Sequence, residues 1–162
     1  MDVVGLITLR EELADDCRVL ADAAAKSARH LTSQHEGRLE ASAFELARSY
    51  NVIEQMALRV ARSFENHVEK DRGWHEALLR RLTLEIPGIR PAFFPTDLRS
   101  QLDESRRFRH LVHHAYDLVL REDRIRELVS IAQSLATRLP SSCNDFAAKV
   151  ASLNDWTLPD GS

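Results

Sequence analysis

The chain has few of the residues that interrupt helices or cross-link small folds. Its 162 residues include five glycines, five prolines and two cysteines. The scarcity of glycine and proline favours long, uninterrupted helices. The cysteines, Cys17 and Cys143, lie far apart, which argues against a disulfide framework and favours a reducing compartment. Cys17 falls on an apolar helical stripe, where a free thiol packs as a small hydrophobic group.

The sequence also lacks long apolar runs and a large excess of positive charge. No apolar stretch approaches the ~18 residues that a membrane-spanning helix needs. The first residues show no basic segment followed by an apolar run, so we expect no signal peptide, no membrane partner and a cytoplasmic location. The formal net charge is −3, so any contact with nucleic acid must come from a local basic patch.

Two long segments carry the periodicity of amphipathic helices. Apolar residues recur at spacings of three and four over residues 6–31 and again over 39–64. The short polar stretch 32–37 joins them. We therefore predict two long helices that pack antiparallel.

A shorter helix and a proline-containing loop follow. Asp71 is a plausible N-cap for a third helix over residues 71–82. Prolines at intervals of four residues exclude a regular helix over 87–95. We interpret this segment as an ordered loop that keeps Phe93 and Phe94 away from water.

The last third of the chain predicts one long helix and one short one. Apolar periodicity indicates a helix over residues 122–139, which Pro140 is expected to stop or kink. Ser142 and Asp145 have the spacing of a capping box, which predicts a final short helix through Leu153.

These elements define the expected fold class. No strand pattern of useful length is present, so we predict an all-α bundle of about five to six helices. A single helical domain is expected over residues 1–162, with its core at about 5–153. The tail beyond Asp155 is expected to be loose, except that Trp156 docks.

The most informative segment is the basic decapeptide, residues 108–117, with the sequence Phe-Arg-His-Leu-Val-His-His-Ala-Tyr-Asp. It lies on a fourth predicted helix, which begins near Thr96 or Asp97. On a helical wheel its apolar residues form a core-facing stripe, and its basic residues face solvent or a partner. The stripe comprises Phe108, Leu111, Val112, Ala115 and Val119; the basic face comprises Arg106, Arg109, His110, His113 and His114. Arginine binds phosphate and histidine transfers protons at neutral pH, so this face suits phosphate chemistry.

Other interpretations of the basic face remain open at this point. The arginines could simply pair with nearby carboxylates such as Asp103 and Glu104 along the helix. One histidine could interact with the C-terminal end of the helix, where positive charge is favoured. His110 and His114 have a spacing that suits a divalent metal, but no third ligand is evident. We therefore predict neither a metal site nor a cofactor.

The decapeptide resembles the motif of a known superfamily. Arg109, His114 and Tyr116 match the Arg-x4-His-x-Tyr motif of HEPN proteins, specifically HepT-like toxins. The Pro-Gly-Ile-Arg-Pro stretch at 87–91 resembles the loop that precedes the motif in one HepT-like subgroup. His113 departs from that subgroup, which has a second arginine at this position.

The resemblance implies a function and roles for the residues. It implies a metal-independent endoribonuclease in which Arg109 holds the scissile phosphate and His114 is the general base or acid. Tyr116 is the residue to which AMP would be added by a minimal nucleotidyltransferase antitoxin. Accessory contacts to RNA are implied for Arg106, His110 and His113.

The resemblance further implies a homodimer in which two motifs share one cleft. Helical geometry supports this expectation, because five residues separate Arg109 and His114 by roughly 140° on an ideal helix. Either the helix ends or distorts near His113, or the two residues act from different subunits. The alternative function is a non-catalytic binding module that partners a nucleotidyltransferase.

Overall fold

A computed structural model of the chain describes residues 1–65, 73–114 and 118–159, and their regular elements are helices apart from one isolated bridge. The elements are α1 (Val3–Thr32), α2 (Arg38–Phe64), α3 (Trp74–Leu82), the short 3-10 helix η1 (Thr96–Leu98), α4 (Arg99–His114) and α5 (Glu122–Leu153). The predicted all-α fold and the two long N-terminal helices are therefore confirmed.

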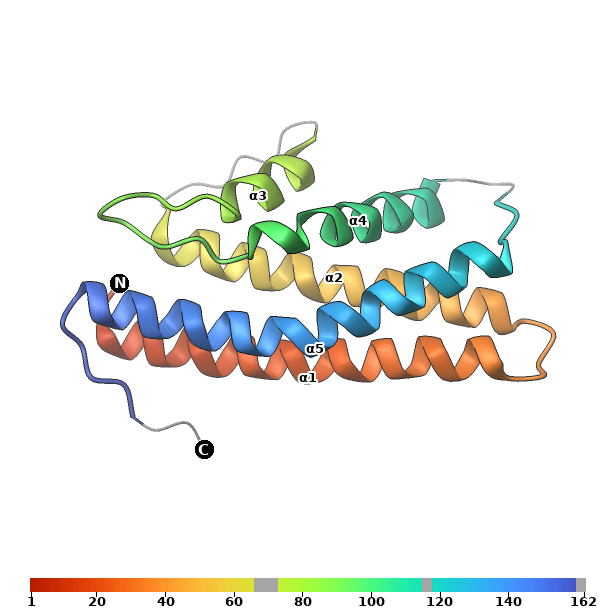
Figure 1. Cartoon of the computed structure of the whole chain (residues 1–162), viewed down its shortest axis with the longest axis horizontal. Coiled ribbons are helices and arrows are strands. Elements are labelled where there is room, and N and C mark those ends of the chain that lie inside the picture. Colours follow the sequence, from red (N-terminus) through yellow and green to blue (C-terminus); the bar gives the residue numbers. More distant parts are fainter. Residues whose placement is uncertain (66–72, 115–117, 160–162) are drawn as a thin grey trace.

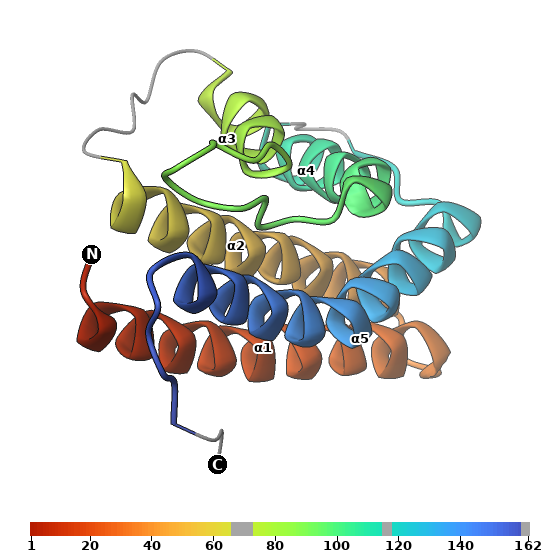
Figure 2. The ribbon, with the colours of Figure 1, turned by 60° about the vertical axis from the view of Figure 1, so that its left-hand side comes forward.

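The helices form a bundle in which α2 is central. Figure 1 shows α1 and α5 side by side and antiparallel, with α3 and α4 on the opposite side of α2. The turned view in Figure 2 shows the same arrangement. The N-terminus lies at the end of the bundle where α2 and α5 both end. This arrangement places α4 directly against α2.

The antiparallel pair of α1 and α2 follows the sequence prediction closely. Asp2 caps α1, because its side chain accepts a hydrogen bond from the Gly5 amide at 2.8 Å. Further along, the buried Ser42 hydroxyl donates to the backbone carbonyl of Ser27 at 2.9 Å. These small side chains allow the two helices to approach closely while their polar atoms remain satisfied.

Helix α5 differs from the prediction at Pro140. Of the two expectations for Pro140, a stop or a kink, the stop is wrong, because one continuous helix passes through it, and the Ser142 hydroxyl donates to the Arg138 carbonyl instead of capping a final short helix. Figure 1 shows that α5 bends about halfway along its length. Pro140 has no amide hydrogen, so one helical bond is missing there, and burial of Leu139 and Cys143 on both sides of it holds the helix together.

Helix α3 begins later than predicted. It starts at Trp74, and its N-cap is Gly73, whose φ of 87° is readily adopted by glycine. Asp71 is therefore not the N-cap, and it lies outside the described residues. In the tail, Trp156 packs against the main core as predicted, and Leu158 packs there as well, which was not predicted.

The loop after α3 is ordered, and Phe93 and Phe94 are buried as predicted. The amides of both residues donate to the Leu82 carbonyl, at 2.8 and 3.0 Å. Their rings pack against the core between α2 and α5, where Phe93 meets Phe146 edge to face. The loop therefore completes the core and sets the position at which η1 and α4 begin.

A fully buried arginine holds this loop. Arg90 has a relative exposure of 0%. Its Nε and Nη2 atoms donate to Glu65 at the end of α2, at 3.2 and 2.9 Å. The carbonyls of Leu84, Pro91 and Arg81 accept its remaining hydrogen bonds. One side chain thus joins the loop to the C-terminal ends of α2 and α3.

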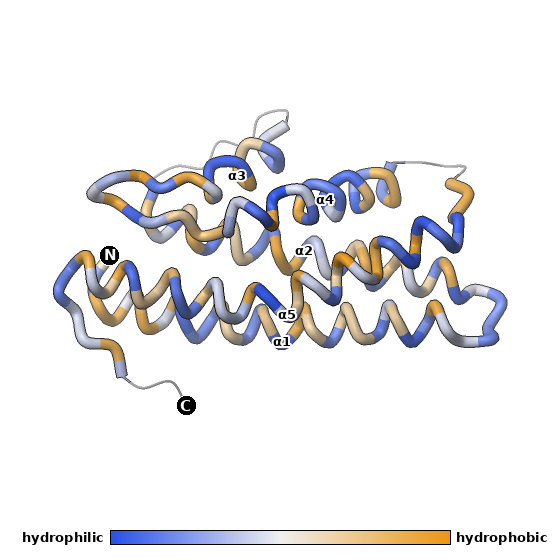
Figure 3. Tube along the Cα trace, viewed as in Figure 1, coloured by the Kyte–Doolittle hydropathy of each residue, from blue (hydrophilic) through white to orange (hydrophobic). Residues whose placement is uncertain are grey.

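The buried apolar residues form two clusters. The larger one extends over α1, α2, α3, the loop and the C-terminal half of α5. The smaller one joins the start of α5 to Leu46 and Phe108. Figure 3 shows hydrophobic and hydrophilic residues interleaved along the helices, with α4 hydrophilic over most of its length. Among the described residues, no helix is long and apolar enough to cross a membrane.

Candidate functional site

Helix α4 carries the basic decapeptide and binds the bundle through a narrow apolar stripe. Phe108 is buried, and Val112 packs against the smaller core cluster, as predicted. Leu111 and Val119, predicted on the same stripe, are instead 46% and 82% exposed. Helix α4 ends at His114, so Val119 leaves the helical register. Ala115 lies outside the described residues.

Two arginines near the motif are neutralised by carboxylates. Arg106 pairs with Asp103 at 2.8 Å and contacts Glu76 on α3 at 3.5 Å. Arg107 pairs with Asp103 at 2.7 Å and with Glu104 at 3.5 Å. The ion-pair interpretation of the basic face therefore applies to these two residues.

Arg109 has a different environment. Its Nε donates to the Asn51 side-chain oxygen on α2 at 3.0 Å, and no ion pair to a carboxylate is found for it in the described part of the chain. The neutral amide fixes the direction of the guanidinium without cancelling its charge. Asn51 was not singled out from the sequence, because a lone asparagine inside a helix gives no signal of its partner.

His110 and His114 lie together on the outer side of α4. Their rings stack with centroids 4.2 Å apart, and His114 Nδ1 lies 2.9 Å from the His110 carbonyl oxygen. A carbonyl only accepts, so this contact places the proton on Nδ1 and leaves Nε2 of His114 as an acceptor. Arg109 turns toward α2 while His114 packs along its own helix, which agrees with the divergence expected from helical geometry.

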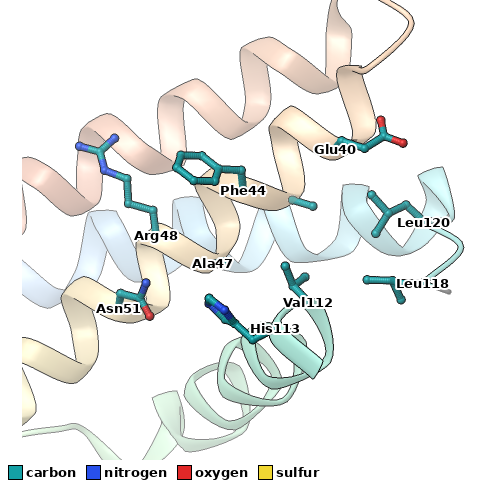
Figure 4. A pocket seen from close by; sticks show the side chains of 10 residues that line it. Glu40, Phe44, Ala47, Arg48, Asn51, Val112, His113, Leu118 and Leu120 are labelled. Atoms are coloured by element: carbon teal, nitrogen blue, oxygen red, sulfur yellow. The ribbon is translucent and has the colours of Figure 1, made fainter. Parts of the chain in front are cut away.

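His113 borders a cavity of about 460 Å³ between α2 and the end of α4, which we call the α2–α4 cavity. Figure 4 shows His113 pointing toward α2, with Asn51 and Arg48 at one end of the cavity and Leu118, Leu120 and the carboxylate of Glu40 at the other. The lining residues are Glu40, Ala43, Phe44, Ala47, Arg48, Asn51, Val112, His113, Leu118 and Leu120. Asn51 thus belongs to the cavity wall and also holds Arg109, so the cavity adjoins the arginine.

A buried tyrosine lies next to Asn51 on α2. Tyr50 precedes Asn51 and is buried, and its hydroxyl has no hydrogen-bond partner in the described ranges. Burial raises the pKa of this phenol far above its ordinary value. One turn later, Glu54 contacts His75, whose ring stacks on Trp74. These contacts attach α3 to the part of α2 that carries Asn51.

The structure does not bring every predicted site residue together. Arg109 and His113 border the α2–α4 side of the helix, whereas His110 and His114 lie on its outer side. Arg106 is engaged in ion pairs. Tyr116 falls in 115–117, outside the described residues. No group of three or more His, Cys, Asp or Glu side chains is arranged for metal binding within the described part.

One of three comparisons with known proteins gave a match. A family model described as HepT-like protein matches residues 41–150, which is more than half of the chain and includes most of α2, all of α3 and α4, and most of α5. The comparisons with curated proteins and with solved structures gave no match. The all-α bundle and the extent of the match lead to one conclusion: the chain belongs to the family of HepT-like HEPN proteins.

Proposed function

We propose that the chain is a metal-independent endoribonuclease toxin of the HepT type. The observation that carries the proposal is Arg109, which Asn51 orients and which no carboxylate neutralises in the part of the chain that the structure describes. An arginine that binds RNA needs both features, since an ion-paired guanidinium has little charge left for a phosphate. Membership of the HepT-like family supports the same role.

In this proposal Arg109 binds the scissile phosphate. The bond to Asn51 uses Nε, so Nη1 and Nη2 are left to donate to two phosphate oxygens. The adjoining α2–α4 cavity, at about 460 Å³, has the size of a small-molecule site and accepts a neighbouring nucleoside of the strand. Phe44 at its wall is 66% exposed and offers a ring face for stacking on a base.

His114 transfers the proton. Histidine both accepts and donates protons at neutral pH, and its Nε2 is the nitrogen that the contact with His110 leaves available. As general base it removes the proton from the ribose 2′-hydroxyl, whose oxygen then attacks the phosphorus. The 5′-oxygen of the next nucleotide leaves with a proton from a general acid. DNA has no 2′-hydroxyl and is therefore not a substrate.

A homodimer completes the site. Arg109 and His114 lie on different sides of α4, so His114 of the second copy acts beside Arg109 of the first. The stripe formed by His110, Leu111 and His114 supports contact at this surface, because the apolar Leu111 is 46% exposed next to the two stacked rings. We further propose that a minimal nucleotidyltransferase silences the dimer by adding AMP to Tyr116.

Cleavage of RNA by the purified chain in excess chelator tests the proposal. Wild-type protein should cleave RNA but not DNA, and Arg109→Ala and His114→Ala should both abolish cleavage. Arg107→Ala is the matched control, since it removes the same charge from an ion-paired position of the same helix. Loss of cleavage on adding chelator would exclude the metal-free mechanism. Equal cleavage by wild type and His114→Ala would exclude the site.

Expression in cells separates the toxin from the alternative, a docking module without catalysis. Induction of the toxin should arrest growth, and Arg109→Ala should relieve the arrest. A docking module should leave growth unchanged in both cases. Co-expression with a nucleotidyltransferase should add whole AMP units to the intact mass, and Tyr116→Phe should prevent the addition.

A further inference from the structure

The only two cysteines of the chain meet in the core although 126 residues separate them. Cys17 on α1 and Cys143 on α5 are both buried and free, and their sulfur atoms lie 3.9 Å apart. The sequence indicated only that Cys17 could pack as a small apolar residue. The packing of α1 against α5 brings the two sulfur atoms close to each other.

Small molecules can reach the pair. A cavity of about 310 Å³ between α1 and α5 is bordered by both cysteines, together with Arg10, Arg18 and Pro140. An oxidant the size of hydrogen peroxide fits such a cavity, and the burial of both cysteines hinders their reaction with the thiols of other proteins. The pair is therefore shielded from exchange with other proteins but not from small peroxides.

Helix α5 lacks one backbone hydrogen bond close to Cys143, at Pro140. A disulfide requires its sulfurs at about 2.05 Å, so the two atoms must approach by about 1.9 Å. Pro140 lies three residues before Cys143 and lacks the amide that would bond the Ala136 carbonyl. Because this turn of α5 lacks one hydrogen bond, it can shift toward α1 at lower cost than an intact helix.

We propose that Cys17 and Cys143 are an oxidation site at which hydrogen peroxide forms a reversible disulfide between α1 and α5. The Cys17 thiolate attacks one peroxide oxygen, the O–O bond breaks, and Cys17 becomes a sulfenic acid while hydroxide takes up a proton as water. The Cys143 sulfur then attacks Cys17, the S–O bond breaks and a second water leaves. Two thiols are oxidised, and one peroxide is reduced to two waters.

The environment of the pair supports this order. The hydrogen bond between the two sulfurs lowers the pKa of Cys17, whereas the same contact and burial raise the pKa of Cys143. Cys17 is thus the first nucleophile and Cys143 the resolving thiol. The inference does not rest on the proposed ribonuclease function, since both residues belong to the α1–α5 side of the larger core cluster and not to the α2–α4 cavity.

Intact mass and thermal unfolding of the full chain test the proposal. After a small excess of hydrogen peroxide, the mass should fall by about 2 Da, and a peptide containing Cys17 should be linked to one containing Cys143. The midpoint of thermal unfolding should rise by about 5–15 °C, because the cross-link closes a long loop. Dithiothreitol should reverse both changes.

Single serine variants provide the matched controls. Cys143→Ser should stop at the Cys17 sulfenic acid, which dimedone traps, while Cys17→Ser should react much more slowly. Wild-type protein that gains oxygen at each cysteine without losing 2 Da would overturn the proposal. Disulfides between chains in place of the internal one would also overturn it. The wild-type measurement decides these outcomes even where a serine variant folds poorly.

Discussion

Replacement of the buried Arg90 should cause one of the largest stability losses available in this chain. Arg90→Met keeps much of the side-chain volume but removes every donor from a site with 0% exposure. The Glu65 carboxylate loses two donated bonds, and three backbone carbonyls lose one each. Removing one partner of a buried ion pair costs about 3–5 kcal/mol; here the largely buried Glu65 would keep only the more exposed Arg81 as its partner.

Chemical and thermal unfolding measure this loss. For a chain of this length each kcal/mol lowers the unfolding midpoint by about 2–4 °C, so Arg90→Met should lower it by about 6–20 °C. Urea unfolding followed by circular dichroism gives the free energy directly, and an unchanged m-value would show that the two-state comparison holds.

A neighbouring arginine is the matched control. Arg81 also pairs with Glu65, at 2.5 Å, but its side chain is 40% exposed. Exposed pairs contribute about 0–1 kcal/mol, so Arg81→Met should have a small effect. Equal losses in the two variants, or a loss below about 1 kcal/mol for Arg90→Met, would refute the reasoning. The double variant Arg90→Met with Glu65→Leu should recover part of the loss, since no buried charge remains.

Three further predictions concern single side chains. Arg38 lowers the pKa of Glu122 in the folded chain, so the unfolded chain binds a proton at this carboxylate first as pH falls. The stability that the pair contributes is complete above the unfolded-state pKa and is lost as pH falls through the folded-state pKa. Glu122→Gln should therefore flatten the decline of stability at acid pH, as measured by urea unfolding. Tyr50→Phe removes a buried hydroxyl without a partner in the described part, and urea unfolding should show a stability unchanged or raised by about 1 kcal/mol. Asn51→Ala should slow RNA cleavage about 10–100-fold without lowering the unfolding temperature, because Arg109 loses its orientation; an unchanged cleavage rate would contradict a positioning role.

Periodicity was sufficient to predict the helices but not the contacts between them. The stripes over 6–31 and 39–64 became α1 and α2, because each buries one continuous face against the other. The separate short helix predicted after Pro140 was wrong, because burial of Leu139 and Cys143 outweighs one missing helical bond. Local sequence rules contain no term for such tertiary packing.

For the site residues too, the geometry within one helix could be predicted, whereas the contacts between helices could not. The wheel predicted that Arg109 and His114 diverge, since this follows from the geometry of one helix. It did not predict that Asn51 holds Arg109, or that His113 borders the α2–α4 cavity. Both depend on how α4 lies against α2, which is decided by apolar residues elsewhere in the two helices. The buried contact of Arg90 with Glu65 was missed for the same reason, because 25 residues separate them.

The pairing of Arg106 and Arg107 with carboxylates has a consequence for the thermodynamics of RNA binding. Of the three arginines within this stretch of α4, only Arg109 brings a charge that a carboxylate has not already balanced in the described structure. Each single-strand phosphate neutralised by a protein releases counterions and adds a slope of about −0.7 to log K against log salt. A dimer with one such arginine per subunit would therefore release few ions. Its affinity for RNA would change little across the salt range in which highly basic nucleases dissociate from their substrates.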